Sequence, residues 1–263
     1  MSRPSHTQGE WETYWKETAR LATHPETDSS SIWEVEAAQA AAKDLERFQP
    51  FLKPELPLVD LGCGSGIQTR FLAGHFPRVI GVDVSPSAVA LAARNNPHPS
   101  LQYRVLDVFD TQAVQAFRAE HGDLHIYMRT LLHLVQPALR AAFAEALGTL
   151  LGRRGVLYLF ELGATAGEYF QAWIHRNGMP VSLQRVLQTG IQPGTVTREH
   201  VLAMFPPERF TVLADGEMTS APMPVRVVRP GSPPTLASEA WAPPGYFLVL
   251  RPREPLPPQE PAP

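Results

Sequence analysis

Short apolar runs alternate with helix-like segments through the middle of the chain. The helix-like segments show apolar positions at intervals of three and four residues, whereas the apolar runs have the length of strands. The last run is strongly apolar, as expected for a strand buried on both faces of a sheet. This alternation predicts an α/β fold with a doubly wound, mostly parallel sheet. The predicted strands are Leu58–Leu61, Val79–Val82, Leu101–Leu106, Leu124–Met128 and Val156–Leu162.

Several helix boundaries carry recognisable signals. Ser85 is followed by Pro86, which is the order of an N-cap and a first helical residue. The apolar spacing over residues 137–151 predicts a helix that Gly152 closes, and another helix is expected around residues 69–75.

The N-terminal fifth has a different pattern. Residues 1–30 are polar apart from aromatic side chains at positions 11, 14 and 15. Ser31 and Glu34 have the spacing of a capping box, and apolar residues recur at helical intervals from Trp33 to Phe48. We therefore expect a helix from Ser31 that ends before Pro50, within an N-terminal helical cap over residues 1–52.

The regular alternation stops after the fifth strand. Residues 163–198 are predicted to form an insertion in the main α/β domain, which spans residues 53–254. Thr197 is expected to cap a helix through Met204. Two further strands, Phe210–Ala214 and Tyr246–Leu250, flank a proline-rich connection. The proline-rich residues 255–263 are expected to be a disordered tail.

The composition of the chain says little about its fold, but it disfavours several kinds of binding partner. A net charge of −3 gives no general attraction to nucleic acid or acidic lipid, so neither is expected as a partner. Cys63 is the single cysteine, which excludes an internal disulfide and a cysteine-based zinc site, and no metal is expected. The polar start and the lack of a run of roughly 20 apolar residues predict a cytoplasmic protein. We expect a monomer or a homodimer.

The first predicted strand runs directly into a glycine loop. Gly62, Gly64 and Gly66 alternate after Asp60 and precede a helix. Such a turn lets the backbone approach a ligand closely and directs helix N-terminal N–H groups toward it. Asp83 ends the second strand, which lies beside the first at the ligand crevice of a doubly wound sheet, where a carboxylate can accept ribose hydroxyls.

Two other glycine loops are disfavoured. A dinucleotide fingerprint requires glycine at position 67, where this chain has Ile67, and Asp60 is unsuited to a neighbouring pyrophosphate. No Gly-Lys-Ser/Thr follows, so a Walker loop is excluded. Asp60 instead suits a ligand that carries an ammonium and a sulfonium group. A nicotinamide-dependent oxidoreductase remains the less favoured alternative.

Residues 59–66 resemble motif I of the class I S-adenosylmethionine-dependent methyltransferases, and residues 81–85 resemble their second motif. The similarity continues at lower specificity through residues 107 and 127–135, and covers about residues 56–162. The resemblance implies a Rossmann-like sheet of seven strands in the order 3-2-1-4-5-7-6, with S-adenosylmethionine as cofactor and S-adenosylhomocysteine as product. It also implies a set of cofactor-contacting residues: Asp60, Gly62, Cys63, Gly64, Gly66, Asp83, Val84, Asp107, Val108 and Arg129.

In that family the glycine loop holds the amino-acid part of the cofactor, the acid matching Asp83 binds the ribose, and the acid matching Asp107 approaches the adenine amino group. Simpler interpretations stay open. The glycines could form only a tight turn, Asp83 could cap the helix after Ser85, and either Asp107 or Asp110 could simply end a strand.

The end of the fourth strand, residues 127–134, is similar to the small-molecule branch of the family, in which it faces the transferable methyl group. The Asn/Asp-Pro-Pro-Tyr/Phe signature of amino-group methyltransferases is absent, and Cys63 belongs to the glycine loop rather than to a cytosine-C5 type of site. His133 is the candidate base, because its solution pKa suits proton transfer near neutral pH. Arg129 could orient an anionic acceptor. Equally, His133 could be packed against the sheet, and Arg129 could pair with Glu161.

Aromatic residues on both sides of the sheet region are candidate walls of an acceptor pocket, although aromatic residues at helical spacing also fit an ordinary core. If they line a pocket, the acceptor is apolar or aromatic. The predicted function is methyl transfer to a small organic molecule such as a secondary metabolite; the alternative is a fold that binds the cofactor without transferring its methyl group. The candidate wall residues are Trp11, Trp15, Trp33, Tyr169 and Trp173.

Overall fold

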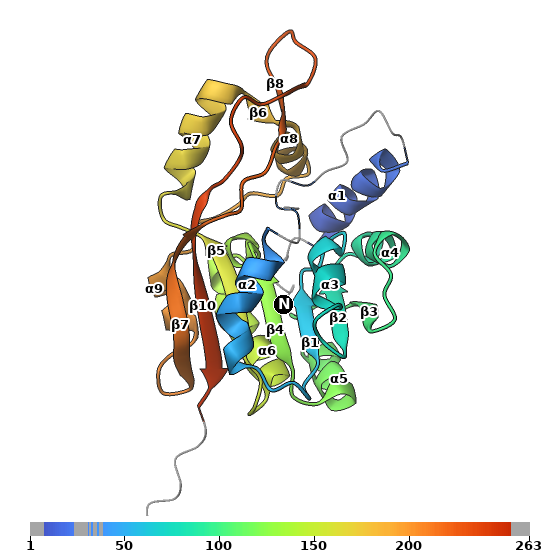
Figure 1. Cartoon of the computed structure of the whole chain (residues 1–263), viewed down its shortest axis with the longest axis vertical. Coiled ribbons are helices and arrows are strands. Elements are labelled where there is room, and N and C mark those ends of the chain that lie inside the picture. The colour runs from blue at the N-terminus through green and yellow to red at the C-terminus, as the bar shows by residue number, and fades with distance from the viewer. Residues whose placement is uncertain (1–7, 24–30, 32, 34–35, 37–38, 254–263) are drawn as a thin grey trace, which may run out of the picture.

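A seven-stranded sheet forms the centre of the molecule (Figure 1), in a computed structural model that describes residues 8–23, 31, 33, 36 and 39–253. The strand order is β3-β2-β1-β4-β5-β10-β7. The first five strands pair in parallel, and β10 pairs antiparallel with both β5 and β7. Along the chain, β7 is the sixth strand of this sheet and β10 is the seventh, so the observed order corresponds to the predicted order 3-2-1-4-5-7-6. The predicted fold class and strand order are confirmed. The strands are β1 (Leu58–Leu61), β2 (Val79–Asp83), β3 (Leu101–Val105), β4 (His125–Arg129), β5 (Leu157–Leu162), β7 (Phe210–Thr219) and β10 (Pro244–Pro252).

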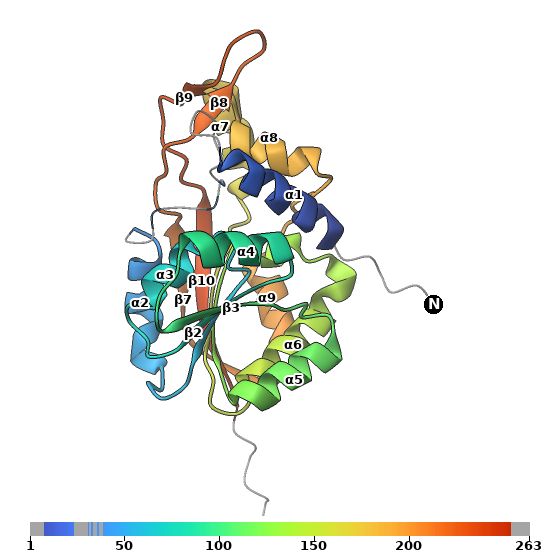
Figure 2. The ribbon, with the colours of Figure 1, turned by 90° about the vertical axis from the view of Figure 1, so that its right-hand side faces the viewer.

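Helices cover both faces of the sheet, which Figure 2 shows edge-on. Alternate strand residues point to opposite faces, so Val59 and Ile80 pack on one side while Leu58 and Val79 pack on the other. Both sets are fully buried, which explains why the inner strands are mostly apolar. One face is covered by α2 (Ala41–Phe48) and α3 (Ile67–Leu72), and the other by α5 (Thr111–His121), α6 (Arg140–Leu151) and α9 (Arg198–Met204).

The capping signals in the sequence correspond to real helix starts. Ser85 accepts the Ala88 N–H at 3.1 Å and begins α4 (Pro86–Asn95). Thr197 caps α9 through a capping box with His200. The helix predicted over residues 137–151 is a 3₁₀ turn, η3 (Pro137–Leu139), followed by α6, which ends at Gly152. Local side-chain chemistry was therefore a reliable guide to these boundaries.

The helix expected from Ser31 begins only at Ala41, and this part of the prediction is wrong. Ser31 does not cap a helix; its hydroxyl lies 2.9 Å from the hydroxyl of Tyr14. Trp33 packs against Trp11, with ring centroids 5.6 Å apart. Tertiary contacts with the N-terminal helix α1 (Gln8–Leu21) thus replace the local helical pattern here. Positions 32, 34–35 and 37–38 lie outside the described residues, as do positions 1–7 and 24–30. A 3₁₀ turn, η1 (Gln49–Phe51), follows α2.

A second, smaller lobe stands over the carboxyl ends of the parallel strands (Figure 1). It contains α7 (Ala166–Asn177), α8 (Val181–Gln188) and a three-stranded sheet in the order β6-β8-β9, with bounds Met179–Pro180, Arg226–Val228 and Thr235–Leu236. The sequence pattern placed an insertion only at residues 163–198, whereas the lobe also takes in the proline-rich connection between β7 and β10. Trp173 and Trp241 join the two segments, with ring centroids 5.0 Å apart.

Within the described part of the chain, the helices are too short or too polar to cross a membrane. The predicted tail, residues 255–263, lies outside the described residues.

Candidate functional site

The glycine loop joins β1 to α3 at the carboxyl edge of the sheet. Gly62 and Cys63 both donate their N–H groups to the Val82 carbonyl, at 2.8 and 3.0 Å, so the loop is fixed to β2. Gly64 has a φ of +53°, and a Cβ on it would lie 2.9 Å from a ring carbon of Trp15. Only glycine therefore allows α1 to lie so close over the loop.

Gly66 has a packing role. It precedes α3 with a φ of +84°, and a Cβ at this position would come within 2.4 Å of the Tyr103 hydroxyl. The Tyr103 hydroxyl itself donates to the Gly66 carbonyl at 3.3 Å. Gly66 lines neither of the two cavities that the loop borders. Gly66 therefore fits the simpler interpretation, in which a glycine of this loop only allows a tight turn.

Asp83 connects the glycine loop with the start of α4. One carboxylate oxygen accepts the Gly64 N–H at 3.1 Å and the other accepts the Ser85 N–H at 3.0 Å. Burial raises the pKa of Asp83 to about 6, although these backbone hydrogen bonds oppose the shift. The cap of α4 is Ser85 itself, so Asp83 supports the turn before the helix and also borders the main cavity.

Asp60 is a second buried acid close to the loop. It accepts a 2.6 Å hydrogen bond from the Thr69 hydroxyl. Burial raises the pKa of Asp60 to about 7; the nearby charge of Asp83 adds to the shift, while Thr69 and Arg129 oppose it. Asp60 and Cys63 line a cavity of about 440 Å³ beside the loop. A cation placed in this cavity would stabilise the ionised carboxylate.

The main cavity, of about 960 Å³, runs along the carboxyl ends of β1, β2 and β4. Its acids are Asp83 and Asp107, and Val84 and Val108 lie beside them. The two candidate acids after β3 have different roles, because Asp110 caps α5 by accepting the N–H groups of residues 112 and 113. Asp107 accepts the Phe109 N–H at 2.9 Å and remains at the cavity wall. The apolar part of the wall consists of Trp11, Trp15, Trp33, Leu61, Leu106, Phe109, Leu131, Leu134, Val135, Leu139 and Phe143.

Arg129, at the end of β4, forms its ion pair with Asp44 and not with Glu161. Its guanidinium lies 4.5 Å from the centre of the Phe160 ring. Asp44 also accepts hydrogen bonds from the hydroxyls of Tyr127, at 2.8 Å, and Tyr158, at 2.5 Å. Arg129 borders both cavities described so far, with its charge balanced by a buried acid.

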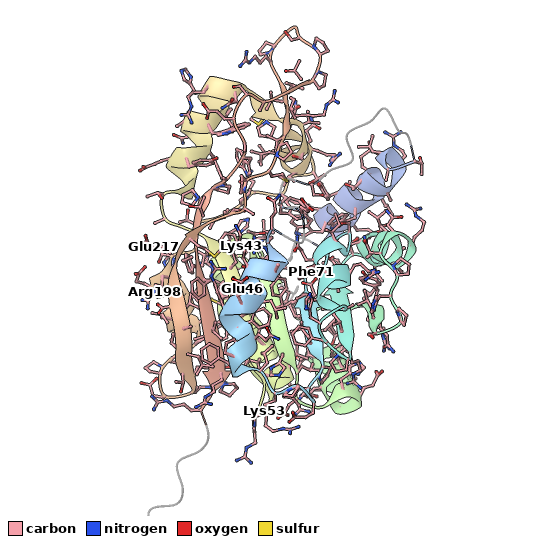
Figure 3. The ribbon with its side chains drawn as sticks, viewed as in Figure 1. Lys43, Glu46, Lys53, Phe71, Arg198 and Glu217 are labelled. Atoms are coloured by element: carbon pink, nitrogen blue, oxygen red, sulfur yellow. The ribbon has the colours of Figure 1, made fainter. Side chains whose placement is uncertain are left out.

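Asp44 was missed in the sequence, although a signal was present. It occupies a position of α2 that falls on the same face as Leu45 and Phe48, and all three are buried. Lys43 and Glu46 lie on the exposed face of α2 (Figure 3). An acid on the apolar face of a helix requires a buried partner.

His133 lies in the 3₁₀ turn η2 (Leu132–Leu134) that follows β4. Its Nδ1 is 2.7 Å from the Glu161 carboxylate, and the residue is buried. Thr130, between β4 and this turn, has a φ of +47°, and it is the one non-glycine residue of the described chain in the left-handed region. Strained backbone of this kind persists where the surrounding structure fixes it, and it concentrates at functional sites.

A third cavity, of about 720 Å³, lies between the turn η2 and the smaller lobe. It shares Trp11, Trp33, Arg129, Thr130 and Leu134 with the main cavity. The two spaces therefore meet at the end of β4. The remaining wall of the third cavity consists of His133, Leu162, Phe170, Leu183, Val186, Pro193, Ser220, Trp241 and Pro243.

The structure separates the candidate aromatic residues into two groups. Trp11 and Trp33 border both cavities, and Trp15 borders the main one. Tyr169 and Trp173 line neither of these two cavities; both are hydrogen-bonded to backbone groups of residues 240–242 inside the smaller lobe. Phe170 lines the third cavity, because neighbouring side chains of the helix α7 point to different sides. Trp241, which stacks on Phe170, lines the same cavity from the connection before β10.

The helix α1 is attached over the crevice by Glu12, which sequence reasoning also missed. Its carboxylate accepts hydrogen bonds from the Ser85 hydroxyl at 2.7 Å and from the Ser87 N–H and hydroxyl at 3.1 and 2.7 Å. Negative charge is favourable at a helix N-terminus such as that of α4. This contact brings Trp11 and Trp15 to the cavity wall.

Comparison with known proteins agrees with this arrangement. The family described as "Methyltransferase domain" matches residues 58–151. The solved structure of an S-adenosylmethionine-dependent methyltransferase from Anabaena variabilis superposes with a TM-score of 0.82 and 33% sequence identity, over 96% of this chain and 98% of that one. This chain belongs to the S-adenosylmethionine-dependent methyltransferases.

Curated methyltransferases match a smaller part of the chain. An N-demethylindolmycin N-methyltransferase from Streptomyces griseus is 29% identical over 93 residues, which are 35% of this chain and 39% of that protein. A ubiquinone biosynthesis O-methyltransferase from Nitrobacter winogradskyi is 29% identical over 132 residues, which are 46% of this chain and 48% of that protein. The chain therefore spans less than half the length of these relatives.

The cofactor of this methyltransferase family is S-adenosylmethionine, and the residues at the site fit it. Asp60 and Asp83 are two buried acids whose raised pKa values a cationic ligand would lower again. The main cavity adds an apolar section, with Val108 and Phe143 in its wall, that suits a flat aromatic base. The site thus offers anionic, polar and apolar parts in one continuous crevice.

Proposed function

We propose that this methyltransferase transfers a methyl group from S-adenosylmethionine to a small organic acceptor with an apolar or aromatic body. The observation that carries the proposal is the meeting of two cavities at Arg129 and Thr130. One cavity contains the glycine loop and two acids, and the other is walled by aromatic and aliphatic side chains. A donor and an acceptor bound in these spaces would approach each other at the end of β4, and such proximity is the main requirement of a displacement reaction.

We assign the cofactor side as follows. When bound, S-adenosylmethionine supplies a methyl group activated by its positively charged sulfur. Asp83 would accept the ribose hydroxyls, Asp107 would accept the adenine amino group, and Gly62 and Gly64 would border the amino-acid part. Asp60, with Cys63 beside it, would balance the positive charge of that part.

On the acceptor side, His133 would remove a proton from the acceptor where its nucleophile carries one. Arg129 would shape the junction of the two cavities rather than bind an anion, because Asp44 already balances its charge. Trp11 and Trp33 would contact both ligands from the N-terminal side. The smaller lobe would close the acceptor space with Phe170 and Trp241.

Calorimetry tests the cofactor assignment. We expect S-adenosylmethionine and S-adenosylhomocysteine to bind and NAD not to bind. Asp83→Asn should weaken binding by roughly 10- to 150-fold, because a hydrogen bond to a charged group is worth about 1.5–3 kcal/mol. Asp215→Asn is the matched control, since Asp215 pairs with Arg198 on the surface of β7. Equal affinity in both variants would remove Asp83 from the ribose site.

Methyl transfer itself needs a separate measurement. A radiolabelled-methyl screen against small aromatic and apolar metabolites should label at least one compound class. Tight binding of the cofactor without any labelled product would favour the alternative that the fold binds S-adenosylmethionine without transferring its methyl group. Binding of NAD in place of the sulfur cofactors would defeat the proposal altogether.

A further inference from the structure

Glu161 is a buried acid, 1% exposed, and most of its hydrogen bonds come from one turn of the chain. One carboxylate oxygen accepts the N–H groups of Leu132 and His133, at 2.7 and 3.2 Å. The other accepts the Leu162 N–H at 2.8 Å and lies 2.7 Å from Nδ1 of His133. A carboxylate is costly to bury unless it is fully hydrogen-bonded, and this one is bonded mainly to the turn that carries His133.

These contacts favour one of the two ring nitrogens of His133 as the one that carries hydrogen. Both oxygens of Glu161 accept hydrogen bonds, so Nδ1 is the donor toward it. A neutral imidazole has one protonated nitrogen, and its lone pair is then on Nε2. His133 borders the third cavity, and Nε2 is the ring nitrogen that Glu161 leaves for a ligand there.

The turn around His133 is also held from the other side. The Gly194 N–H donates to the His133 carbonyl at 2.8 Å, and the Thr130 N–H donates to the Phe160 carbonyl at 2.8 Å. The left-handed conformation of Thr130 directs the chain from β4 into the turn. The imidazole is therefore fixed by its ring, by its backbone and by the strand before it, which is the arrangement that catalytic positioning requires.

The wall of the third cavity indicates the chemical class of the acceptor. Among the described residues that line it, the ionisable side chains are His133 and Arg129, and Asp44 balances Arg129. No acid of the described wall offers a partner to a cationic amine. The aromatic side chains, Trp33 and Trp241 among them, suit a ring-bearing ligand. A neutral hydroxyl is a weak nucleophile, and removal of its proton by a base in the cavity wall would make it more reactive.

We propose that Glu161 is the positioning residue for a His133 base, and that the acceptor is a hydroxyl group on an apolar, ring-bearing molecule. This inference rests on the proposed function. In the step that follows from it, the acceptor oxygen forms a bond to the methyl carbon while the carbon–sulfur bond breaks. The electron pair of that bond stays on sulfur, which becomes a neutral thioether. The hydroxyl proton moves to Nε2 of His133, and Glu161 stabilises the resulting imidazolium.

The tautomer of His133 tests the role of Glu161 without any cofactor. In ¹⁵N-histidine-labelled protein, long-range proton–nitrogen NMR spectra at pH 8 should show His133 protonated at Nδ1, with the signal assigned by its loss in His133→Gln. Glu161→Gln should shift the population toward the Nε2-protonated form. The control variant Glu217→Gln should leave the tautomer population of His133 unchanged. Tyr246 of β10 pairs with Glu161 on one side and with Glu217 on the other, and Glu217 is exposed on the edge strand β7 (Figure 3). An Nε2-protonated His133 in the unaltered protein would overturn the proposal, even if Glu161→Gln does not fold.

The acceptor class is tested with two probes that share one body, 1-naphthol and 1-naphthylamine, and radiolabelled S-adenosylmethionine. The naphthol should be labelled in preference to the amine. In Glu161→Gln, kcat should fall by roughly 10²–10⁴-fold, the usual contribution of a general base, with little change in KM or in cofactor affinity. Preference for the amine, or an unchanged kcat in Glu161→Gln, would refute the proposal. Failure of the unaltered protein to bind S-adenosylmethionine would instead defeat the proposed function, and the tautomer would still decide the role of Glu161.

Discussion

Replacing Asp44 by asparagine should destabilise this protein more than any surface change. Asp44 is fully buried, and it is the acceptor for the guanidinium of Arg129 and for the hydroxyls of Tyr127 and Tyr158. Removing its charge leaves Arg129 as a buried cation without its counterion. Breaking a buried ion pair in this way costs about 3–5 kcal/mol.

Asparagine keeps one acceptor oxygen, so at least one of the three donors to Asp44 loses its bond, at a further cost of about 1–3 kcal/mol. These contributions share partners and do not add fully, which gives an expected loss of about 4–6 kcal/mol. Typical domains have a free energy of unfolding of about 5–15 kcal/mol, so Asp44→Asn should leave the fold marginal.

Urea unfolding, followed by tryptophan fluorescence and far-ultraviolet circular dichroism, measures this loss if both signals report one transition. The double variant Asp44→Asn/Arg129→Gln removes the unpaired charge and should recover about 2–3 kcal/mol relative to Asp44→Asn alone. Asp215→Asn, which breaks an exposed pair with Arg198, should cost about 1 kcal/mol or less. A loss below about 1 kcal/mol in Asp44→Asn, or a double variant less stable than the single one, would show that the buried pair does not stabilise the fold as argued.

Two further predictions concern the cofactor and the helix over it. Burial raises the pKa values of Asp60 and Asp83 to about 7 and 6, so each carboxyl gains a proton as the pH falls through these values. The affinity for the cationic cofactor should therefore decrease from pH 8 to pH 5.5. Binding of the cofactor near pH 6.5 should release protons from these carboxyls. Calorimetry in buffers of different ionisation enthalpy checks this, and a flat profile without proton release would contradict it. Glu12→Gln should weaken the attachment of α1 by about 1–2 kcal/mol and speed tryptic cleavage within α1, because Glu12 accepts three hydrogen bonds at the start of α4. Glu17→Gln, which breaks only the exposed pair with Arg20, serves as the control, and equal cleavage rates in the two variants would argue against the attachment.

Much of the central fold follows from local sequence. The strands β1, β2 and β5 are buried on both faces, so their side chains are mostly apolar and the strands can be recognised directly. Each carries one acid near its carboxyl end: Asp60, Asp83 and Glu161. Caps such as Ser85 act through hydrogen bonds within three residues, and they can be identified from sequence for the same reason. The fifth helix, α5, was not predicted because its hydrophobic pattern is weak, with Val114 and Phe117 as its only buried apolar residues.

The sequence by itself determined the glycine loop and the acid at the end of β2, because each depends on residues close together along the chain. The order of the strands followed from the resemblance of these motifs to a known family. Only the tertiary structure decided the partners of Arg129 and His133. Asp44 lies 85 residues from Arg129, and Glu161 lies 28 residues from His133, so no local spacing relates them. The same holds for the third cavity, whose walls come from α1, the turn after β4 and both segments of the smaller lobe. Several acids in the sequence could pair with Arg129 or His133. Which of them does so depends on hydrogen bonds and packing between distant segments, and these form only when the sheet brings the strand ends together.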